Sequence, residues 1–445
     1  MRRALLVSLC ITIESLVCSY ISYPVFAQTA TVSNLTLDAA INQAEANNPQ
    51  LLAAGRSIPL AQAGLTIAGA GLNPRLGIDI PFGQAETKHT VSIEKTFELG
   101  GKRQARIGLA NAQIQQADLQ LNLLRWQIRN QVRQAYAELG IAQGAQQLSQ
   151  ETLAINGQLV DIAKVRLNAG DVAQADVVQA RFTFEQARQK QEPAANRVRQ
   201  AAIRLNTLLN QPTNTVINLV DGAAFRFSLS APKTALRPDQ KLPALSVLQQ
   251  VAKASRLDLA VARQQIQLGN AQIRLARAAR IPDVTLAAGF VWDPGLPSTP
   301  TPVTTAVILS ARVDLPLFNN GQGTLNQARA TISQSEAQLV ALEAQIDGEV
   351  ATAYENLASA QRLLLRDRTV LLPQAIEVLN LSRQSYQFGQ TGLSDALLVQ
   401  QSVQTVFDGF YTDILAYQTA LGALEQAVNQ PLSTINKNTN APLTH

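Results

Sequence analysis

Very few side chains in this sequence can act as nucleophiles, general acids or soft-metal ligands. The two cysteines, Cys10 and Cys18, lie near the N-terminus, and the two histidines are His89 and the final residue, His445. Zinc and similar ions need several Cys or His ligands placed together, and these four residues cannot supply such a set. A phosphate-binding loop would need Gly-Lys-Ser or Gly-Lys-Thr, and the sequence contains neither. We therefore expect no catalytic residue, no cofactor and no metal site, and we expect that the protein is not an enzyme.

Two aspartates that follow glycines are the polar feature with a repeated spacing. Asp176 lies six positions after Gly170, and Asp395 lies six positions after Gly389. Glycine commonly ends a helix in a left-handed conformation. Carboxylates in the first turn of the next helix bind its free amides and interact favourably with its dipole. Helix capping is therefore one interpretation of both aspartates, and it is the favoured one for Asp171.

Each glycine turn belongs to a unit that the chain contains twice. Apolar or small residues recur every seven positions over 107–142, and again over 325–360, which is 218 positions later. A strict spacing of seven predicts supercoiled helices that pack knobs into holes. In a second series, Leu371 and Val378 of the second unit occupy the positions equivalent to Leu153 and Val160 of the first. One residue is inserted before the second glycine, because Gly170 and Gly389 are 219 positions apart.

These repeats predict long helices that turn back on themselves. The segment 102–167 contains no proline, so one helix of roughly 100 Å is expected there. It returns after Gly170 as a helix over about 173–210, and the second unit returns over about 394–429. Pro373 should kink the second long helix. The two pairs together form a four-helix antiparallel unit.

Four short segments alternate apolar and polar residues and are expected to be strands. They cover 76–82, 91–97, 284–292 and 307–315 and form two hairpins. Aromatic residues near their ends suit the aromatic girdles of a membrane barrel: Phe82, Phe97, Phe290, Trp292 and Phe318. Four strands cannot close a barrel, so three copies of the chain would have to supply twelve strands. A small soluble sheet that caps a coiled coil is the alternative.

Composition excludes some functions and places the chain outside the cytoplasm. The net charge is +5, and the arginines are spread along helices without interleaved aromatics, so we expect no nucleic-acid binding. Arg2 and Arg3 precede an apolar run that ends near Ala27, which is typical of a signal peptide. No later apolar run reaches the roughly 18 residues of a membrane helix.

The domain organisation follows from these features. We assign 1–27 to a signal peptide, 28–212 to a first repeat with the strand pair 76–97, 213–242 to a linker, 243–432 to a second repeat with the strand pair 284–315, and 433–445 to a disordered tail.

The repeat and three phrases resemble the TolC family of outer-membrane efflux channels over about residues 34–432. The phrases are FELGGKRQAR at 97–106, NAGDVAQADVVQAR at 168–181 and YQFGQTGLSDAL at 386–397. The first is similar to phrases of the heavy-metal efflux subgroup. The resemblance implies a mainly α fold with a small β part, in which coiled-coil helices form an α-barrel and four strands per chain complete a 12-stranded β-barrel in a homotrimer.

The resemblance also implies a site at the turns. Gly170, Asp171, Asp176, Tyr386, Gly389 and Asp395 would form the periplasmic tip and its aperture. Asp395 matches the aspartate that lines the narrowest ring of the family, whereas Leu398 occupies the position of a second acidic ring. A latch between an aspartate, a tyrosine and an arginine closes the mouth in the family. Asp176 and Tyr386 match two of these residues, but Thr391 stands where the arginine is expected.

The implied function is passive conduction in a tripartite efflux system. The chain would lie in the outer membrane, in contact with lipid, and extend into the periplasm. Its partners would be a periplasmic adaptor and an inner-membrane pump. Two alternatives remain open: the outer-membrane component of type I protein secretion, and a periplasmic coiled-coil adaptor or stalk.

Overall fold

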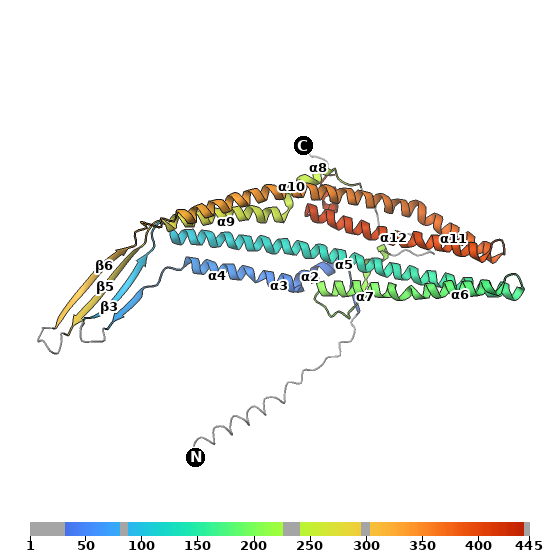
Figure 1. Ribbon diagram of the computed structural model, residues 1–445, viewed down its shortest axis with the longest axis horizontal. Helices are drawn as coiled ribbons and strands as arrows, with labels where there is room; N and C mark the ends of the chain where they lie inside the picture. The colour runs from blue at the N-terminus through green and yellow to red at the C-terminus, as the bar shows by residue number, and fades with distance from the viewer. Residues whose placement is uncertain (1–31, 81–87, 226–240, 295–302, 440–445) are drawn as a thin grey trace, which may run out of the picture.

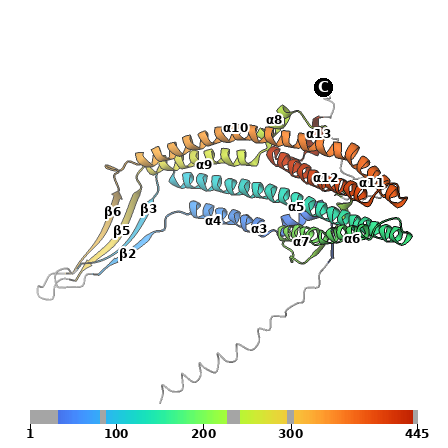
Figure 2. The ribbon, with the colours of Figure 1, turned by 45° about the vertical axis from the view of Figure 1, so that its right-hand side comes forward.

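The chain is elongated, with a four-stranded sheet at one end and two turns between helices at the other (Figure 1). The computed structural model describes residues 32–80, 88–225, 241–294 and 303–439. The predicted signal peptide 1–27 and most of both predicted hairpin loops lie outside the described residues, as do Phe82 and His445. The C-terminal part of the described chain lies near the middle of the body (Figure 2).

The first long helix has the predicted extent. Helix α5 spans Lys102–Ala169, 68 residues, and Gly170 ends it with a φ of 83°. No proline interrupts its hydrogen bonds. Its apolar series is buried at Ile128 and Ala135 and half-buried at Ile107, Ile114 and Leu121. The predicted heptad phase of α5 is therefore confirmed at Ile128 and Ala135.

The second long helix is interrupted next to Pro373, where a kink was expected. Helix α10 (Gln322–Arg366) passes through a π-helical turn, η2 (Asp367–Leu371), into α11 (Leu372–Gln387). Pro373 has no N–H to donate to the carbonyl four residues earlier. A π turn adds one residue to a helix, so it accounts for the change of offset from 218 to 219.

The π turn makes part of the predicted second apolar series wrong. Leu371 is half-buried and Val378 is exposed, whereas Leu372 and Leu379 are buried. The inserted residue rotates the helix, so that the next residue along the chain faces the core. The buried series continues at a spacing of seven to Tyr386.

The return helices differ between the two units. Helix α12 is continuous over Leu393–Val428, but the first return helix is divided into α6 (Gln174–Gln189) and α7 (Gln191–Leu208). The single helix predicted over 173–210 is therefore wrong. Pro193 cannot donate to the carbonyl of Gln189, which explains the break at Lys190.

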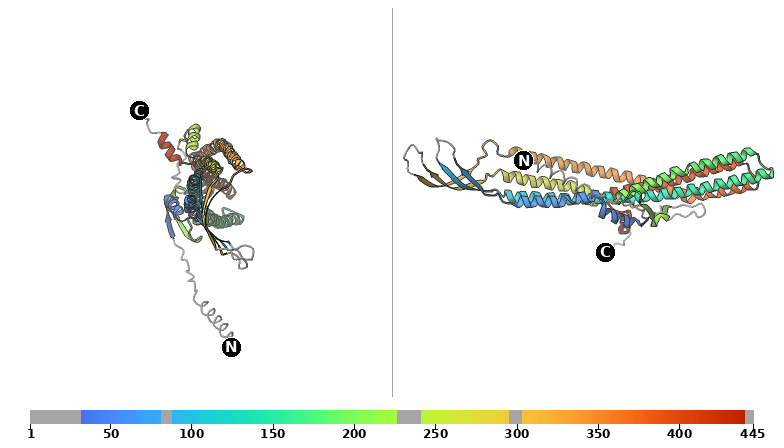
Figure 3. Two further views of the ribbon diagram at one scale, coloured as in Figure 1. Left: turned by 90° about the vertical axis from the view of Figure 1, so that its left-hand side faces the viewer. Right: turned by 90° about the horizontal axis from the view of Figure 1, so that it is seen from below.

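Shorter helices precede each strand pair. Helices α2 (Leu37–Asn47), α3 (Pro49–Gly55) and α4 (Ser57–Gly69) come before the first pair, and α8 (Leu245–Ser255) and α9 (Leu257–Ala279) come before the second. Helices α4 and α9 both pack on α5, which extends the helical layer toward the sheet (Figure 3).

The sheet joins the two predicted hairpins. Its strands are β2 (Arg75–Asp79), β3 (His89–Phe97), β5 (Val284–Asp293) and β6 (Thr304–Val313), in the order β2-β3-β5-β6. All neighbours are antiparallel. Strands β2 and β6 are therefore the edges, and within one chain each of them has a partner on one side only.

One face of the sheet is apolar and uncovered. Side chains alternate between faces along a strand, so the register places two apolar rows on one face: Leu76, Ile93, Ala288 and Leu309, and Ile78, Val91, Phe290 and Val307. The opposite face carries Arg75, Glu94 and Ser310 in one row. Val307 is 73% exposed and Leu309 is 78% exposed, so no core of the same chain covers the apolar face.

Two further features were not predicted. Strand β1 (Val32–Leu35) pairs in parallel with β4 (Val216–Leu219), which a 3-10 turn, η1 (Val220–Phe225), follows. The predicted linker therefore contains a strand. Four residues are too few to show the alternation by which a strand is recognised in a sequence. The predicted disordered tail begins instead with α13 (Leu432–Thr439), because Leu432 and Ile435 are buried against the core.

Candidate functional site

The two glycine turns have the same backbone hydrogen bonds. Gly170 N–H donates to Leu167 O at 3.0 Å, and Asp171 N–H donates to Arg166 O at 2.9 Å. Gly389 N–H and Gln390 N–H repeat this pattern at the end of α11. Both glycines have positive φ, 83° and 76°, as the sequence predicts. The turns lie at the same end of the chain, far from the sheet (Figure 1).

A small apolar cluster supports the turns from inside. It is formed by Leu159, Val160, Ala163, Val177, Ala180, Tyr386, Leu393, Ala396 and Leu397. These residues come from α5, α6, α11 and α12, so all four helices of the tip contribute. We call this region the tip cluster.

An arginine that the sequence analysis did not select joins the two turns. Arg166, in the last turn of α5, donates from Nη1 to Tyr386 O at 2.9 Å. Its guanidinium carbon lies 5.0 Å from the centroid of the Tyr386 ring, which is a cation–π contact. The sequence signal was weak, because a basic residue in the last turn of a helix is ordinary. Arg166 and Tyr386 therefore connect helix ends that are 220 residues apart.

Tyr386 makes no hydrogen bond to Asp176 through its hydroxyl. The side chain is fully buried, and its hydroxyl has no hydrogen-bond partner. Burial raises the pKa of Tyr386, the positive charge of Arg166 lowers it, and the negative charge of Asp176 raises it further. Asp176 is thus near enough to act by charge alone. Thr391, at the position where the resemblance expects an arginine, also has a buried hydroxyl without a partner.

The remaining aspartates of the site are exposed. Asp171 lies two residues before Ala173, the N-cap of α6, and Asp395 lies in the first turn of α12, whose N-cap is Gly392. Neither N-cap residue makes a side-chain hydrogen bond to its helix. Interpreting Asp171 as a helix cap is therefore wrong, because Ala173 is the N-cap of α6. Asp395 places a negative charge at the N-terminal end of α12, where it interacts favourably with the helix dipole, and at the surface of the tip.

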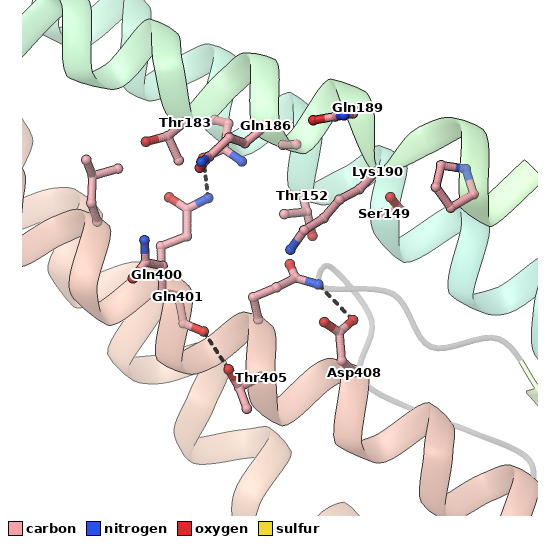
Figure 4. Close-up of a pocket in the computed structure, with 15 residues that line it drawn as sticks. Ser149, Thr152, Thr183, Gln186, Gln189, Lys190, Gln400, Gln401, Thr405 and Asp408 are labelled. Atoms are coloured by element: carbon pink, nitrogen blue, oxygen red, sulfur yellow. Dashed lines mark hydrogen bonds between the residues drawn. The ribbon is translucent and has the colours of Figure 1, made fainter.

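A polar groove of about 650 Å³ lies above the tip cluster, between α5, α6 and α12 (Figure 4). Its lining includes Gln400, which donates to Asn156, and Gln404, which donates to Asp408 at 3.0 Å. Amides and hydroxyls predominate along its walls. The groove can therefore form hydrogen bonds.

The part of the chain that the structure describes contains no candidate metal site and no candidate membrane-spanning helix. Groups of three or more His, Cys, Asp or Glu side chains that could hold a metal ion were not found there. Among the described helices, none combines the length and the hydropathy needed to cross a membrane.

The outer membrane efflux protein family matches both halves of the chain, over residues 40–211 and 248–430. The cobalt-zinc-cadmium resistance protein CzcC of Cupriavidus metallidurans is 26% identical over 385 residues, which cover 85% of this chain and 86% of CzcC. The nickel-cobalt-cadmium resistance protein NccC of Alcaligenes xylosoxydans is 25% identical, over 65% of this chain and 62% of NccC.

Solved structures share the fold at low identity. The outer membrane protein VceC of Vibrio cholerae gives a TM-score of 0.67 at 20% identity, and covers 89% of this chain and 96% of its own. The open state of the MtrE outer membrane channel of Neisseria gonorrhoeae gives 0.66 at 19% identity, with 89% of each chain covered. The match over both halves and the shared architecture show that the chain belongs to the outer membrane efflux protein family, whose members are channels of the outer membrane.

Proposed function

We propose that three copies of this chain form one passive conduit from the periplasm to the exterior. The observation that carries the proposal is the sheet, which has two edges unpaired within the chain, β2 and β6, and one exposed apolar face. Lipid tolerates no open sheet edge, whereas three sheets of four strands joined edge to edge would close a barrel. The apolar rows would then face lipid, and the row of Arg75, Glu94 and Ser310 would face water.

In this arrangement the helices continue the conduit and the glycine turns surround its far mouth. Both turns of each chain lie at one end (Figure 1), so three chains would present six turns. Asp395 is exposed there, and three copies of its carboxylate would concentrate negative charge at a narrow opening. The link between Arg166 and Tyr386 would hold the two turns of each chain together and keep this mouth narrow.

The cargo that fits the relatives is a divalent transition-metal ion. CzcC and NccC are named for resistance to cobalt, zinc, cadmium and nickel. The described part of this chain has no cluster of metal ligands, so an inner-membrane pump, reached through a periplasmic adaptor, would select the ion. The chain would then only pass it on.

The two repeats 28–212 and 243–432, preceded by a signal peptide 1–27, remain our proposal for the organisation of the chain. Each repeat would contribute one glycine turn to the mouth and one strand pair to the barrel.

Crosslinking in cells, followed by copurification and mass spectrometry, tests the proposed function. An inner-membrane pump for metal ions that copurifies with an adaptor and this chain is the expected result. An ATP-driven protein exporter in its place would overturn the metal-efflux proposal and favour type I secretion. A control with Glu185→Gln, which changes an exposed ion pair on α6, should give the same partners.

A further inference from the structure

The π turn η2 places a buried carboxyl group at the bend of the second long helix. Leu372 N–H donates to Asp367 O, five residues earlier, which defines the π turn. Asp367 is 8% exposed, and its buried Oδ2 atom accepts no hydrogen bond from an N–H or O–H group of the described residues. Pro373 follows in the first turn of α11 and leaves the carbonyl of Thr369 without its usual donor. The backbone is therefore weakened where the acid is buried.

A second carboxyl group faces the first from the neighbouring helix. Asp413 of α12 acts on Asp367 through its side chain and its negative charge, and Arg366 is the positive charge that acts on the same carboxyl. Two ionised carboxylates have no proton to donate, and their charges repel. When one of them carries a proton, an O–H group can donate to the other. A hydrogen bond between the two carboxyl groups therefore needs one proton.

The first repeat lacks this arrangement. The positions equivalent to Asp367 and Asp413 are Ser149 and Ala194, at offsets of 218 and 219. Ser149 lies within the uninterrupted helix α5, and its hydroxyl accepts a hydrogen bond from Gln191 at 2.9 Å. The acidic pair thus occurs only in the repeat that contains the bend, which makes the first repeat an internal control.

We propose that Asp367 and Asp413 share one proton, and that loss of this proton loosens the bend at η2 so that α11 can move relative to α12. Helix α11 ends at the turn that holds Tyr386 and Gly389. A looser bend would therefore let the second turn of the tip move more than the first turn, which follows the uninterrupted helix α5.

The direction of the pH effect follows from Asp367. Burial, then the hydrogen bond and charge of Asp413, raise the pKa of Asp367 from 3.8 to about 6, against the lowering effect of Arg366. A raised carboxyl pKa means that the packed bend binds the proton more tightly than the open bend does. Acidification from pH 6 toward pH 4 therefore stabilises the packed bend, and this stabilisation is lost above about pH 6.

Hydrogen–deuterium exchange of the full-length protein in detergent, from pH 5 to pH 8, tests the proposal. After correction for intrinsic amide exchange, the opening equilibrium at residues 368–374 should rise about tenfold over this range, almost all of it below pH 7. The equivalent segment of α5, residues 150–156, should show no such change. The readout does not require conduction, so this proposal and the proposed conduit can fail separately.

Two variants decide the outcome. Asp367→Asn provides an amide that donates to the ionised Asp413 without any bound proton, so exchange at the bend should lose its pH dependence. Asp408→Asn removes an exposed carboxyl from the same helix as Asp413 and should keep the wild-type dependence. A flat wild-type profile, or a dependence that persists in Asp367→Asn, would overturn the proposal. If Asp367→Asn does not assemble, Asp413→Asn provides the same comparison, because that residue is only half-buried.

Discussion

Replacing Arg166 by glutamine should release the two turns of the tip from each other. The substitution removes a hydrogen bond of 2.9 Å from a charged donor and a cation–π contact at 5.0 Å. A hydrogen bond from a charged group contributes about 1.5–3 kcal/mol, and a cation–π contact about 0.5–2 kcal/mol. Arg166 is half-buried, so the two contacts together are worth about 2 kcal/mol, or about 30-fold in the equilibrium between tied and released turns.

Single-channel recording in planar bilayers measures this equilibrium directly. The variant should spend more time in states of high conductance, while the assembly keeps its mass. Lys164→Gln is the matched control, because it removes the same charge from the same helix at an exposed ion pair with Asp161. Tyr386→Phe should behave like the wild type, since the ring and the backbone carbonyl remain and the hydroxyl has no partner.

Three results would refute this reasoning. Equal effects of Arg166→Gln and Lys164→Gln would show that only net charge matters. A large effect of Tyr386→Phe would restore a latch through the tyrosine hydroxyl. An unchanged conductance in Arg166→Gln would show that the link does not hold the mouth.

Three further substitutions test other parts of the structure. Leu121→Asp puts a charge into the heptad series of α5 and should cost several kcal/mol of stability in thermal unfolding, whereas the exposed Gln120→Asp should cost little, and equal losses would contradict the phase. Asp395→Asn should lower the cation selectivity of the channel in bilayers without changing the mass of the assembly, and the difference from the wild type should shrink as the salt concentration rises. If selectivity is unchanged and the melting temperature falls, Asp395 acts only on the dipole of α12. Gly389→Ala should cost about 1–2 kcal/mol of stability in thermal unfolding because φ is 76°; a wild-type melting curve would refute the strain.

The long helices and the strands could be predicted because their periods are regular and extend over many residues. The spacing of seven correctly placed Ile128 and Ala135 in the core of α5, and the alternation of two correctly placed the four strands. Local backbone rules also predicted both left-handed glycines. The fold that is shared with the family therefore follows from patterns that a single sequence contains.

The features that were missed depend on contacts between distant segments. The pairing of β1 with β4 joins residues 184 positions apart, such as Asn34 and Asn218, and neither strand is long enough to show a period. The burial of α13 depends on a surface formed by other helices. Pro373 predicted a disturbance, but only the structure shows a π turn that shifts the buried residues by one position.

At the tip, sequence reasoning found the turns and missed the connection between them. The turns are local and follow from glycine, whereas the contact of Arg166 with Tyr386 crosses 220 positions. An arginine from the first turn makes this contact, and the resemblance expects one in the second. Comparing residue types at equivalent positions could not reveal that the arginine comes from the first turn and not from the second.

Native mass spectrometry of the full-length protein, extracted from the outer membrane in detergent, tests the central claim most directly. In the proposed conduit, two further copies of the chain pair with the edges of β2 and β6 and complete the barrel, so a mass of three chains is the predicted result. A stable monomer that needs no detergent would contradict the account.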